Sequence, residues 1–292
     1  MLLDTERMFL YKYLSPDRIS ILRDGLIRFS QPQAFNDPFE LKPHIAEIAD
    51  RERLKENLEA NLQQLLKEEY AKQPAHVRAV VPFEFFLKFA MSKQEEMLNG
   101  MEEMARYATP QLQKVMHEGF EKHVGVLSLT EKPSNLLMWA HYSDSHLGYV
   151  IEFDSSHPFF DQRKSEEDEL RHLRKVTYTA NRPSLSLHQI EDFNEFLVKS
   201  TEWSYEQEWR MLHALSDAEQ KIEDQPFDIH LFRIPFKAFN SVIIGARATH
   251  GTAEEIKAAL AENPELSHVT LYQMRIHDIR FELVMERVAT NR

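Results

Sequence analysis

The chain has 292 residues, enough for one large domain or for one domain with a sizeable insertion. Its 47 acidic and 35 basic residues give a net charge of −12, which argues against broad nonspecific binding to nucleic acid. The absence of cysteine excludes disulfides and thiolate chemistry and predicts a cytoplasmic protein. No signal peptide and no apolar run of membrane length is recognisable, so no membrane partner is expected. The seven glycines form no GxGxxG or P-loop motif, so neither a Rossmann nor a Walker nucleotide site is expected.

The first thirty residues predict two strands joined by a short helix. Residues 9–14 form the first strand, with Tyr13 and Lys12 on opposite sides of it. A helix follows over residues 16–24, and the second strand covers residues 26–30.

The loop over residues 31–40 contains the turn signal Asn-Asp-Pro. The two phenylalanines of this loop, Phe35 and Phe39, are expected to anchor it to the core. Two interpretations of Asn36 and Asp37 stay open. They are part of the rim of a site, or they bond their own backbone in a structural turn.

Residues 45–121 differ in character, because they are rich in Glu, Lys and Leu with apolar residues near helical spacing. This pattern predicts three or four helices inserted between strands as a lobe. Their charges are interpreted as a solvated face.

The segment from 124 to 154 predicts a strand, a short helix and a second strand. The strands cover residues 124–130 and 148–153, and Ser134 is the expected cap of the helix between them. Trp139 and Tyr142 are three residues apart and share a face of that helix. They are either the wall of a site or a wedge in the core.

Residues 187–203 predict a helix, and residues 204–213 predict a strand. Alternation places Glu206, Glu208 and Arg210 on one face of that strand, opposite an apolar face. Aromatic neighbours favour partial burial of these carboxylates, which shifts pKa values and is common in sites. The alternative is an ion-paired strand surface.

Further elements complete an α+β fold. They are strands over residues 176–179, 231–236, 242–245, 268–277 and 280–284, and a helix that begins with a capping box at Thr252. We expect a single domain over residues 1–292 with a bent or split mixed β-sheet of seven or more strands and a helical insertion over residues 45–121.

Three motifs in order, FNDPFE, MWAHYSDSHLG and EWR, carry a resemblance to the DUF2971 family of uncharacterised bacterial proteins. The resemblance runs from end to end of the chain apart from the helical lobe. It names a family and leaves its activity open.

The chain also resembles the ADP-ribosyltransferase superfamily, whose enzymes place three separated elements around NAD. Lys12 and Tyr13 stand at the first element, where the superfamily has His or Arg. The second element corresponds to Ser128, Trp139 and Tyr142, and the third, of the E-x-E form, to Glu206 and Glu208. The resemblance implies an ADP-ribosyltransferase-like fold and NAD as the substrate.

This resemblance implies roles for the residues. Cleavage of the nicotinamide–ribose bond passes through an oxocarbenium-like state, which Glu208 would stabilise while Glu206 lies near the acceptor. His141 is a further catalytic candidate. The ring faces of Trp139 and Tyr142 would hold nicotinamide, and Lys12, Arg28 or Arg210 would offset the charge of the pyrophosphate. Other candidate binding residues are Tyr13, Asn36, Asp37 and Ser128. Glu208→Gln is expected to abolish activity and leave the fold nearly intact.

Two other function classes stay open. A metal-dependent hydrolase or nuclease would use Asp37, Glu40, Glu206, Glu208 and His141, but no known ligand spacing supports it, so no metal is expected. A non-catalytic sensor would bind a nucleotide in the same pocket. An effector or defence role fits the first class, and the sequence indicates neither a protein or nucleic-acid acceptor nor an oligomeric state.

Overall fold

The computed structural model describes residues 7–289, which form two compact units. The sheet unit comprises the residues up to 42, residues 119–182 and the residues from 193 onward. The helical unit comprises residues 43–118 and 183–192. Each unit has a buried apolar cluster of its own, so each is described separately.

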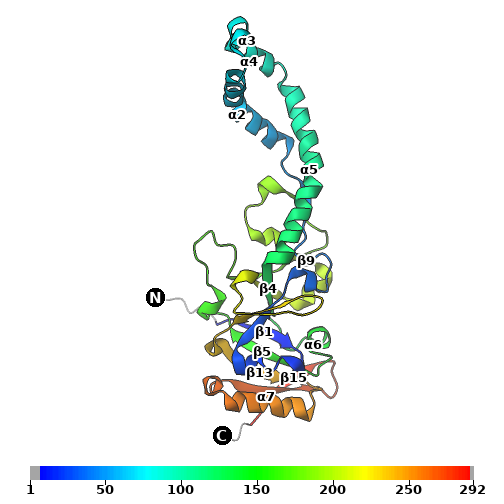
Figure 1. The fold of residues 1–292 in the computed structure, drawn as a ribbon. Helices are drawn as coiled ribbons and strands as arrows, with labels where there is room; N and C mark the ends of the chain where they lie inside the picture. The colour runs from blue at the N-terminus through cyan, green and yellow to red at the C-terminus, as the bar shows by residue number, and fades with distance from the viewer. Residues whose placement is uncertain (1–6, 290–292) are drawn as a thin grey trace, which may run out of the picture. The chain divides into compact units, whose positions relative to one another are not determined.

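An eight-stranded mixed sheet forms the centre of the sheet unit, in the order β15-β14-β13-β5-β1-β4-β10-β6 (Figure 1). Strands β13 and β14 are parallel, and the other neighbours are antiparallel. The expected mixed α+β architecture is thereby confirmed. The strands are β1 (Phe9–Leu14), β4 (Val124–Thr130), β5 (Tyr149–Asp154), β6 (Leu173–Lys175), β10 (Glu208–Ala214), β13 (Phe239–Ile244), β14 (Thr270–Ile276) and β15 (Leu283–Arg287).

The sheet opens between β1 and β4. Strands β1 and β4 pair at one position, where Tyr11 lies opposite Thr130, whereas β10 pairs with β4 along the whole length of β4. Beyond that pair, the ammonium of Lys12 donates a hydrogen bond to the carbonyl of Ser128 at 3.0 Å. A side chain thus bridges the gap where a backbone ladder would continue.

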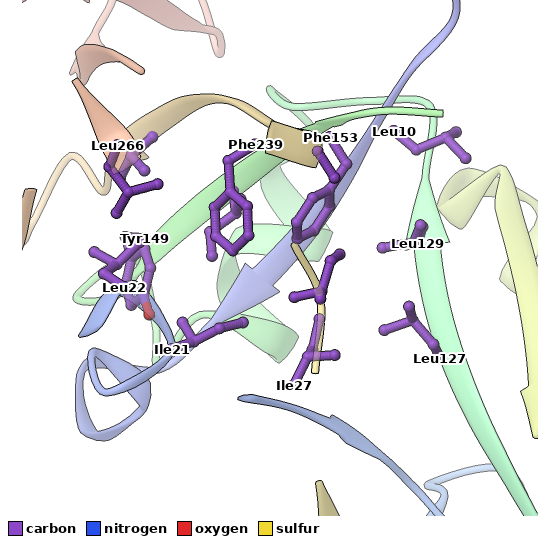
Figure 2. Packing of buried hydrophobic residues seen from close by; sticks show 14 of the residues in the cluster. Leu10, Ile21, Leu22, Ile27, Leu127, Leu129, Tyr149, Phe153, Phe239 and Leu266 are labelled. Carbon is purple, nitrogen blue, oxygen red and sulfur yellow. The ribbon is translucent and has the colours of Figure 1, made fainter. Parts of the chain in front are cut away.

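The two faces of the sheet carry different apolar clusters. Along β5, Tyr149, Ile151 and Phe153 belong to the larger cluster, and Val150 belongs to the smaller one, as the two-residue period of a strand requires. The larger cluster also includes side chains of α1 (Ile21–Asp24) and α7 (His250–Glu262), and part of it is drawn in Figure 2. The smaller cluster includes side chains of α6 (Leu136–Tyr142).

Two smaller sheets complete the sheet unit. One is three-stranded and antiparallel, formed by β11 (Gln220–Ile222), β12 (Ile229–Arg233) and β2 (Leu26–Phe29). The other pairs β7 (Thr177–Thr179) with β9 (Val198–Ser200) in parallel. Gly25 lets the chain turn from α1 into β2, because it adopts a left-handed conformation with φ of 68°.

The prediction of a helix over residues 187–203 is wrong. That stretch contains short 3-10 helices and strand β9, followed by a 3-10 helix, Thr201–Glu206. Strand β9 pairs with β7 over three residues, from Thr177 opposite Val198 to Thr179 opposite Ser200. Pairing with β7 decides the structure here, and local propensity does not.

The expected helix caps are also corrected. Asn135 caps α6 in place of Ser134, because its side chain accepts hydrogen bonds from the next turn. Thr249 caps α7 in place of Thr252, because the hydroxyl oxygen of Thr249 accepts a hydrogen bond from the backbone N–H of Thr252.

The helical unit is built from α2 (Arg51–Ala71), α3 (Ala75–Val80), α4 (Phe83–Met91) and the part of α5 (Gln94–His123) that precedes residue 119. Leu58, Leu62, Leu66 and Leu98 lie at the centre of its core. A parallel strand pair, β3 (His44–Glu47) and β8 (Ser184–Ser186), belongs to the same unit. No helix within residues 7–289 combines the length and apolar character that crossing a bilayer requires.

Candidate active site

A cavity of about 630 Å³ lies in the sheet unit, beside the opening between β1 and β4. Its volume falls within the range typical of small-molecule sites. Five stretches of chain line it: β1 with the residues after it, the loop over residues 30–40, the end of β4, α6 with the residue after its C-terminal turn, and residues 199–208.

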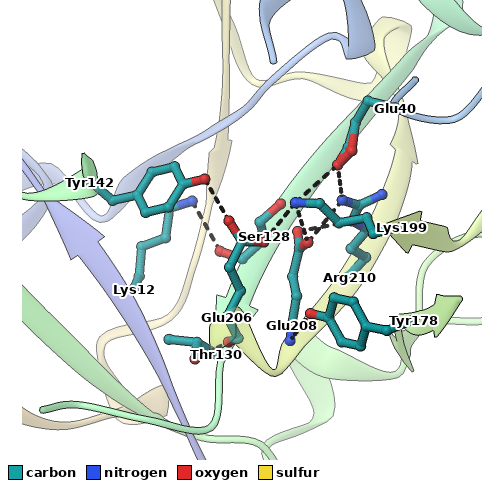
Figure 3. Close-up of polar contacts among 10 residues, drawn as sticks. All are labelled: Lys12, Glu40, Ser128, Thr130, Tyr142, Tyr178, Lys199, Glu206, Glu208 and Arg210. Atoms are coloured by element: carbon teal, nitrogen blue, oxygen red, sulfur yellow. Dashed lines mark hydrogen bonds and ion pairs between the residues drawn. The ribbon is translucent and has the colours of Figure 1, made fainter. Parts of the chain in front are cut away.

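An ion-paired network forms one wall of the cavity (Figure 3). The ammonium of Lys199 lies 2.6 Å from Glu206 Oε2 and 3.3 Å from both Glu208 Oε2 and Glu40 Oε1. Arg210 donates to both carboxylate oxygens of Glu208, at 2.9 and 2.8 Å, and also to Glu40. Three buried carboxylates thus share two cations, as buried charges require.

The backbone conformation changes from helical to extended between Glu206 and Glu208, the two glutamates of the network. Glu206 ends the 3-10 helix, and Gln207 adopts a left-handed conformation with φ of 43° before β10 begins at Glu208. The hydroxyl of Thr130 donates to the carbonyl of Glu206 and so ties this turn to β4. The sequence prediction of one continuous strand is therefore wrong, yet both carboxylates reach the same ammonium, that of Lys199.

The environments of these two carboxylates shift their pKa values in opposite directions. Burial by itself would raise the pKa of Glu208, but Arg210 and Lys199 lower it to about 2. Burial raises the pKa of Glu206, and the charge of Glu208 raises it further against the opposing effect of Lys199. Tyr142 donates to Glu206 Oε1 at 2.6 Å, and the pKa of this tyrosine is raised by burial and by Glu206. Such a pair of divergent carboxyl groups is the usual basis of acid and base roles.

Lys12 is the cation of the cavity that has no carboxylate partner within hydrogen-bonding distance in the described chain. Its ammonium donates to the Ser128 carbonyl. Burial lowers the pKa of Lys12 to about 8, opposed by the charge of Glu208 and assisted by that of Arg28. The hydroxyl of Ser128 in turn bonds Glu208.

Most of the residues predicted for the site line this cavity, although they are far apart in sequence. They are Lys12, Tyr13, Asn36, Asp37, Ser128, His141, Tyr142, Glu206 and Glu208. Asp37 also accepts a hydrogen bond from the backbone N–H of Phe39 at 2.9 Å, so it forms the structural turn that the sequence left open.

This cavity is not lined by three of the predicted binding residues: Arg28, which lines a smaller cavity, Trp139 and Arg210. Trp139 is 0% exposed, stands edge-on to Tyr13 and donates from its indole to the Pro133 carbonyl at 2.8 Å, so its ring cannot stack on a ligand. Arg210 is 1% exposed and pairs with the buried carboxylates of Glu208 and Glu40 without lining the cavity, so it cannot neutralise a pyrophosphate there. Trp139 is the core wedge, and Arg210 positions carboxylates.

Lys199, Trp203 and Phe35 are among the lining residues that sequence reasoning missed. Lys199 and Trp203 lie in the stretch wrongly predicted as a helix, which gave no signal that either side chain faces a site. Phe35 was expected to be a core anchor, and it lines the cavity, with the guanidinium of Arg210 5.7 Å from its ring centroid. The ammonium of Lys199 lies 4.9 Å from the Trp203 ring centroid.

The metal ligands of the alternative function contact cations of the protein. Glu40, Glu206 and Glu208 all contact the ammonium of Lys199. Within residues 7–289, no group of three or more His, Asp or Glu side chains is arranged to hold a metal ion.

Comparison with known proteins gives one match. Residues 138–211, which include most of α6, all of β5 and the start of β10, match the family described as "Protein of unknown function (DUF2971)". No curated protein and no solved structure matches the chain. Over this segment the chain is similar to the DUF2971 family, which supports that resemblance and leaves the function to be argued from the site.

Proposed function

We propose that the cavity binds NAD and cleaves the bond between nicotinamide and ribose, transferring ADP-ribose to water or to an acceptor. One observation carries this proposal: Glu206 and Glu208 share the ammonium of Lys199 on one cavity wall, and their pKa values shift in opposite directions. Glu208 stays ionised over the physiological range, and Glu206 is the carboxylate that can exchange a proton.

The chemistry assigns a separate role to each carboxylate. As the bond from ribose C1′ to the nicotinamide nitrogen breaks, its electron pair leaves with nicotinamide, which becomes neutral. Positive charge develops on the ribose, and the fixed negative charge of Glu208 stabilises it. A water or acceptor oxygen then bonds to C1′, and its proton passes to Glu206.

The placement of other residues supports the same proposal. Ser128 and Lys199 both bond Glu208, and Arg210 fixes its plane, so the carboxylate is oriented before substrate binds. With Trp139 in the core, Tyr142 and Trp203 are two of the aromatic side chains of the cavity that can contact the nicotinamide ring. The three elements of the ADP-ribosyltransferase resemblance also meet at one cavity.

The test is release of nicotinamide from NAD by the purified protein, with Glu206→Gln as the main variant. Glutamine keeps the size and accepts hydrogen bonds, but it cannot take a proton. We expect a fall in turnover on the order of 10²–10⁴-fold. The matched control is Glu202→Gln, a surface glutamate of the same 3-10 helix, which should keep full turnover.

The other function classes give different results in the same assay. Release that is insensitive to EDTA supports the proposal, and metal-dependent cleavage of a phosphodiester would replace it with the hydrolase. NAD binding without turnover would replace it with the sensor. Wild-type turnover by Glu206→Gln would remove this carboxylate from the mechanism.

A further inference from the structure

A second cavity, of about 290 Å³, adjoins the first. Five residues line both: Lys12, Tyr13, Ser15, Ser30 and Tyr142. The remaining walls come from the segment between β1 and β2, from β2 itself, and from apolar side chains of β11 and β12. A ligand can therefore extend from one cavity into the other past Lys12 and Tyr142.

The lining of this second cavity is cationic. Lys12, Arg18 and Arg28 contribute three positive charges, and no Asp or Glu is among its described lining residues. This contrasts with the net charge of −12 for the whole chain. The hydroxyls of Ser20 and Ser30 in the lining can donate hydrogen bonds, whereas that of Ser15 donates to Asp17.

Arg28 is the least satisfied of these cations. Its Nε is buried and has no hydrogen-bond partner in the described chain. Burial lowers the pKa of Arg28, and the neighbouring charge of Arg18 lowers it further, against the opposing charge of Asp224. Arg18 itself is paired at the surface with Asp17, at 3.4 Å. Arg28 thus lines the cavity with a charge that the protein compensates incompletely, which favours an anion in the cavity.

We infer that the second cavity binds the diphosphate of the nucleotide substrate, with Arg28 as its principal ligand and Lys12 at the junction between the cavities. This inference rests on the proposed function for the identity of the substrate. Arg28 and Lys12 repel each other, and an anion between them would relieve that repulsion. The apolar wall formed by Ile222, Ile229 and Leu231 lowers the local dielectric and strengthens the attraction.

This arrangement divides the dinucleotide between the two cavities. The diphosphate would lie between the cations of the smaller cavity, and the nicotinamide riboside would extend past Lys12 toward Glu206 and Glu208. A bidentate guanidinium is well suited to phosphate oxygens.

Calorimetry with inorganic pyrophosphate tests the inference directly on the full chain. We expect wild-type protein to bind it and Arg28→Gln to bind about tenfold more weakly or worse. Arg23→Gln removes the same charge from the exposed face of α1 and should bind as wild type does. Arg28→Lys keeps the positive charge but loses the two parallel donors of the guanidinium, so its affinity should lie between those of wild type and Arg28→Gln. Such a graded loss would show that the effect of Arg28→Gln is not caused by misfolding.

A kinetic comparison separates this inference from the proposed function. Arg28→Gln should raise the KM for NAD about tenfold and leave both the kcat for NAD and the KM for nicotinamide riboside, which has no phosphate, unchanged. Equal pyrophosphate affinity in wild type and Arg28→Gln would overturn the diphosphate site even if NAD is cleaved. Pyrophosphate binding that depends on Arg28 in a protein without NAD turnover would uphold the anion site and overturn only the proposed function.

Discussion

At the scale of single residues, the network makes Glu206 and Glu208 unequal. The folded protein favours the ionised form of Glu208, because its pKa is lowered to about 2, and disfavours that of Glu206, because its pKa is raised. Replacing the carboxylate by a neutral side chain of the same size should therefore cost the folded state far more stability at Glu208 than at Glu206. The sequence-based expectation that Glu208→Gln leaves the fold nearly intact is revised on this ground.

We expect Glu208→Gln to lower the free energy of unfolding at pH 7 by about 3–5 kcal/mol, because it leaves Arg210 and Lys199 with one carboxylate fewer in a buried site. Glu206→Gln should change it by less than about 1 kcal/mol, because the lost charge was unfavourably placed. Urea unfolding of both variants and of Glu202→Gln measures this. Equal stability of Glu208→Gln and wild type would show that the network adds no stability.

The pH dependence of that difference has a definite sign. The folded pKa of Glu208 lies below the ordinary value of 4.5, so its contribution is fully present above pH 4.5 and is lost as the pH falls toward 2. The gap between wild type and Glu208→Gln should therefore shrink over that window.

At the scale of secondary-structure elements, α6 links β4 to the site. Asn135 accepts from the backbone N–H groups of Leu137 and Met138, and its amide donates to the Tyr205 carbonyl at 3.1 Å. The cap thus holds the helix that carries Tyr142 against the 3-10 helix that carries Glu206.

Asn135→Ala should lower the free energy of unfolding by about 1–2 kcal/mol, at the upper end for a helix cap because the bond to Tyr205 is lost as well. Ser134→Ala, at the neighbouring exposed residue, should change it by less than about 0.5 kcal/mol. Thermal unfolding of the two variants decides between these caps. A larger effect at Ser134 would reverse the assignment.

How far the sequence predicts the elements depends on where their hydrogen bonds go. The strands around 9–14, 124–130 and 149–154 were predictable, because long runs of β-branched and aromatic residues are buried on the sheet. The stretch from 187 to 206 was not, because β9 exists only through pairing with β7. Its misassignment concealed Lys199, the cation that joins the carboxylates of the site. The choice between adjacent caps depends on backbone dihedral angles, which Ser134 and Asn135 do not reveal by type alone.

At the scale of the whole molecule, the two compact units of the described chain have separate buried apolar clusters. Leu98 is 1% exposed in the core of the helical unit, and Leu10 is fully buried in the larger cluster of the sheet unit. All residues that line the two cavities belong to the sheet unit. The site should therefore tolerate damage to the core of the helical unit.

Leu98→Ala should destabilise the helical unit by about 2–5 kcal/mol, because it creates a cavity in a small core. Hydrogen exchange measures the response of each unit: amides of α2 and α4 should lose protection, while those of β5 and β13 keep it, since exchange reports local opening in cooperative parts of a protein. Leu10→Ala is the matched variant and should give the opposite pattern. Nicotinamide release should survive Leu98→Ala and fall in Leu10→Ala. Loss of protection throughout the chain in Leu98→Ala would mean that both units unfold as one, and the sheet unit would then depend on the helices inserted within it.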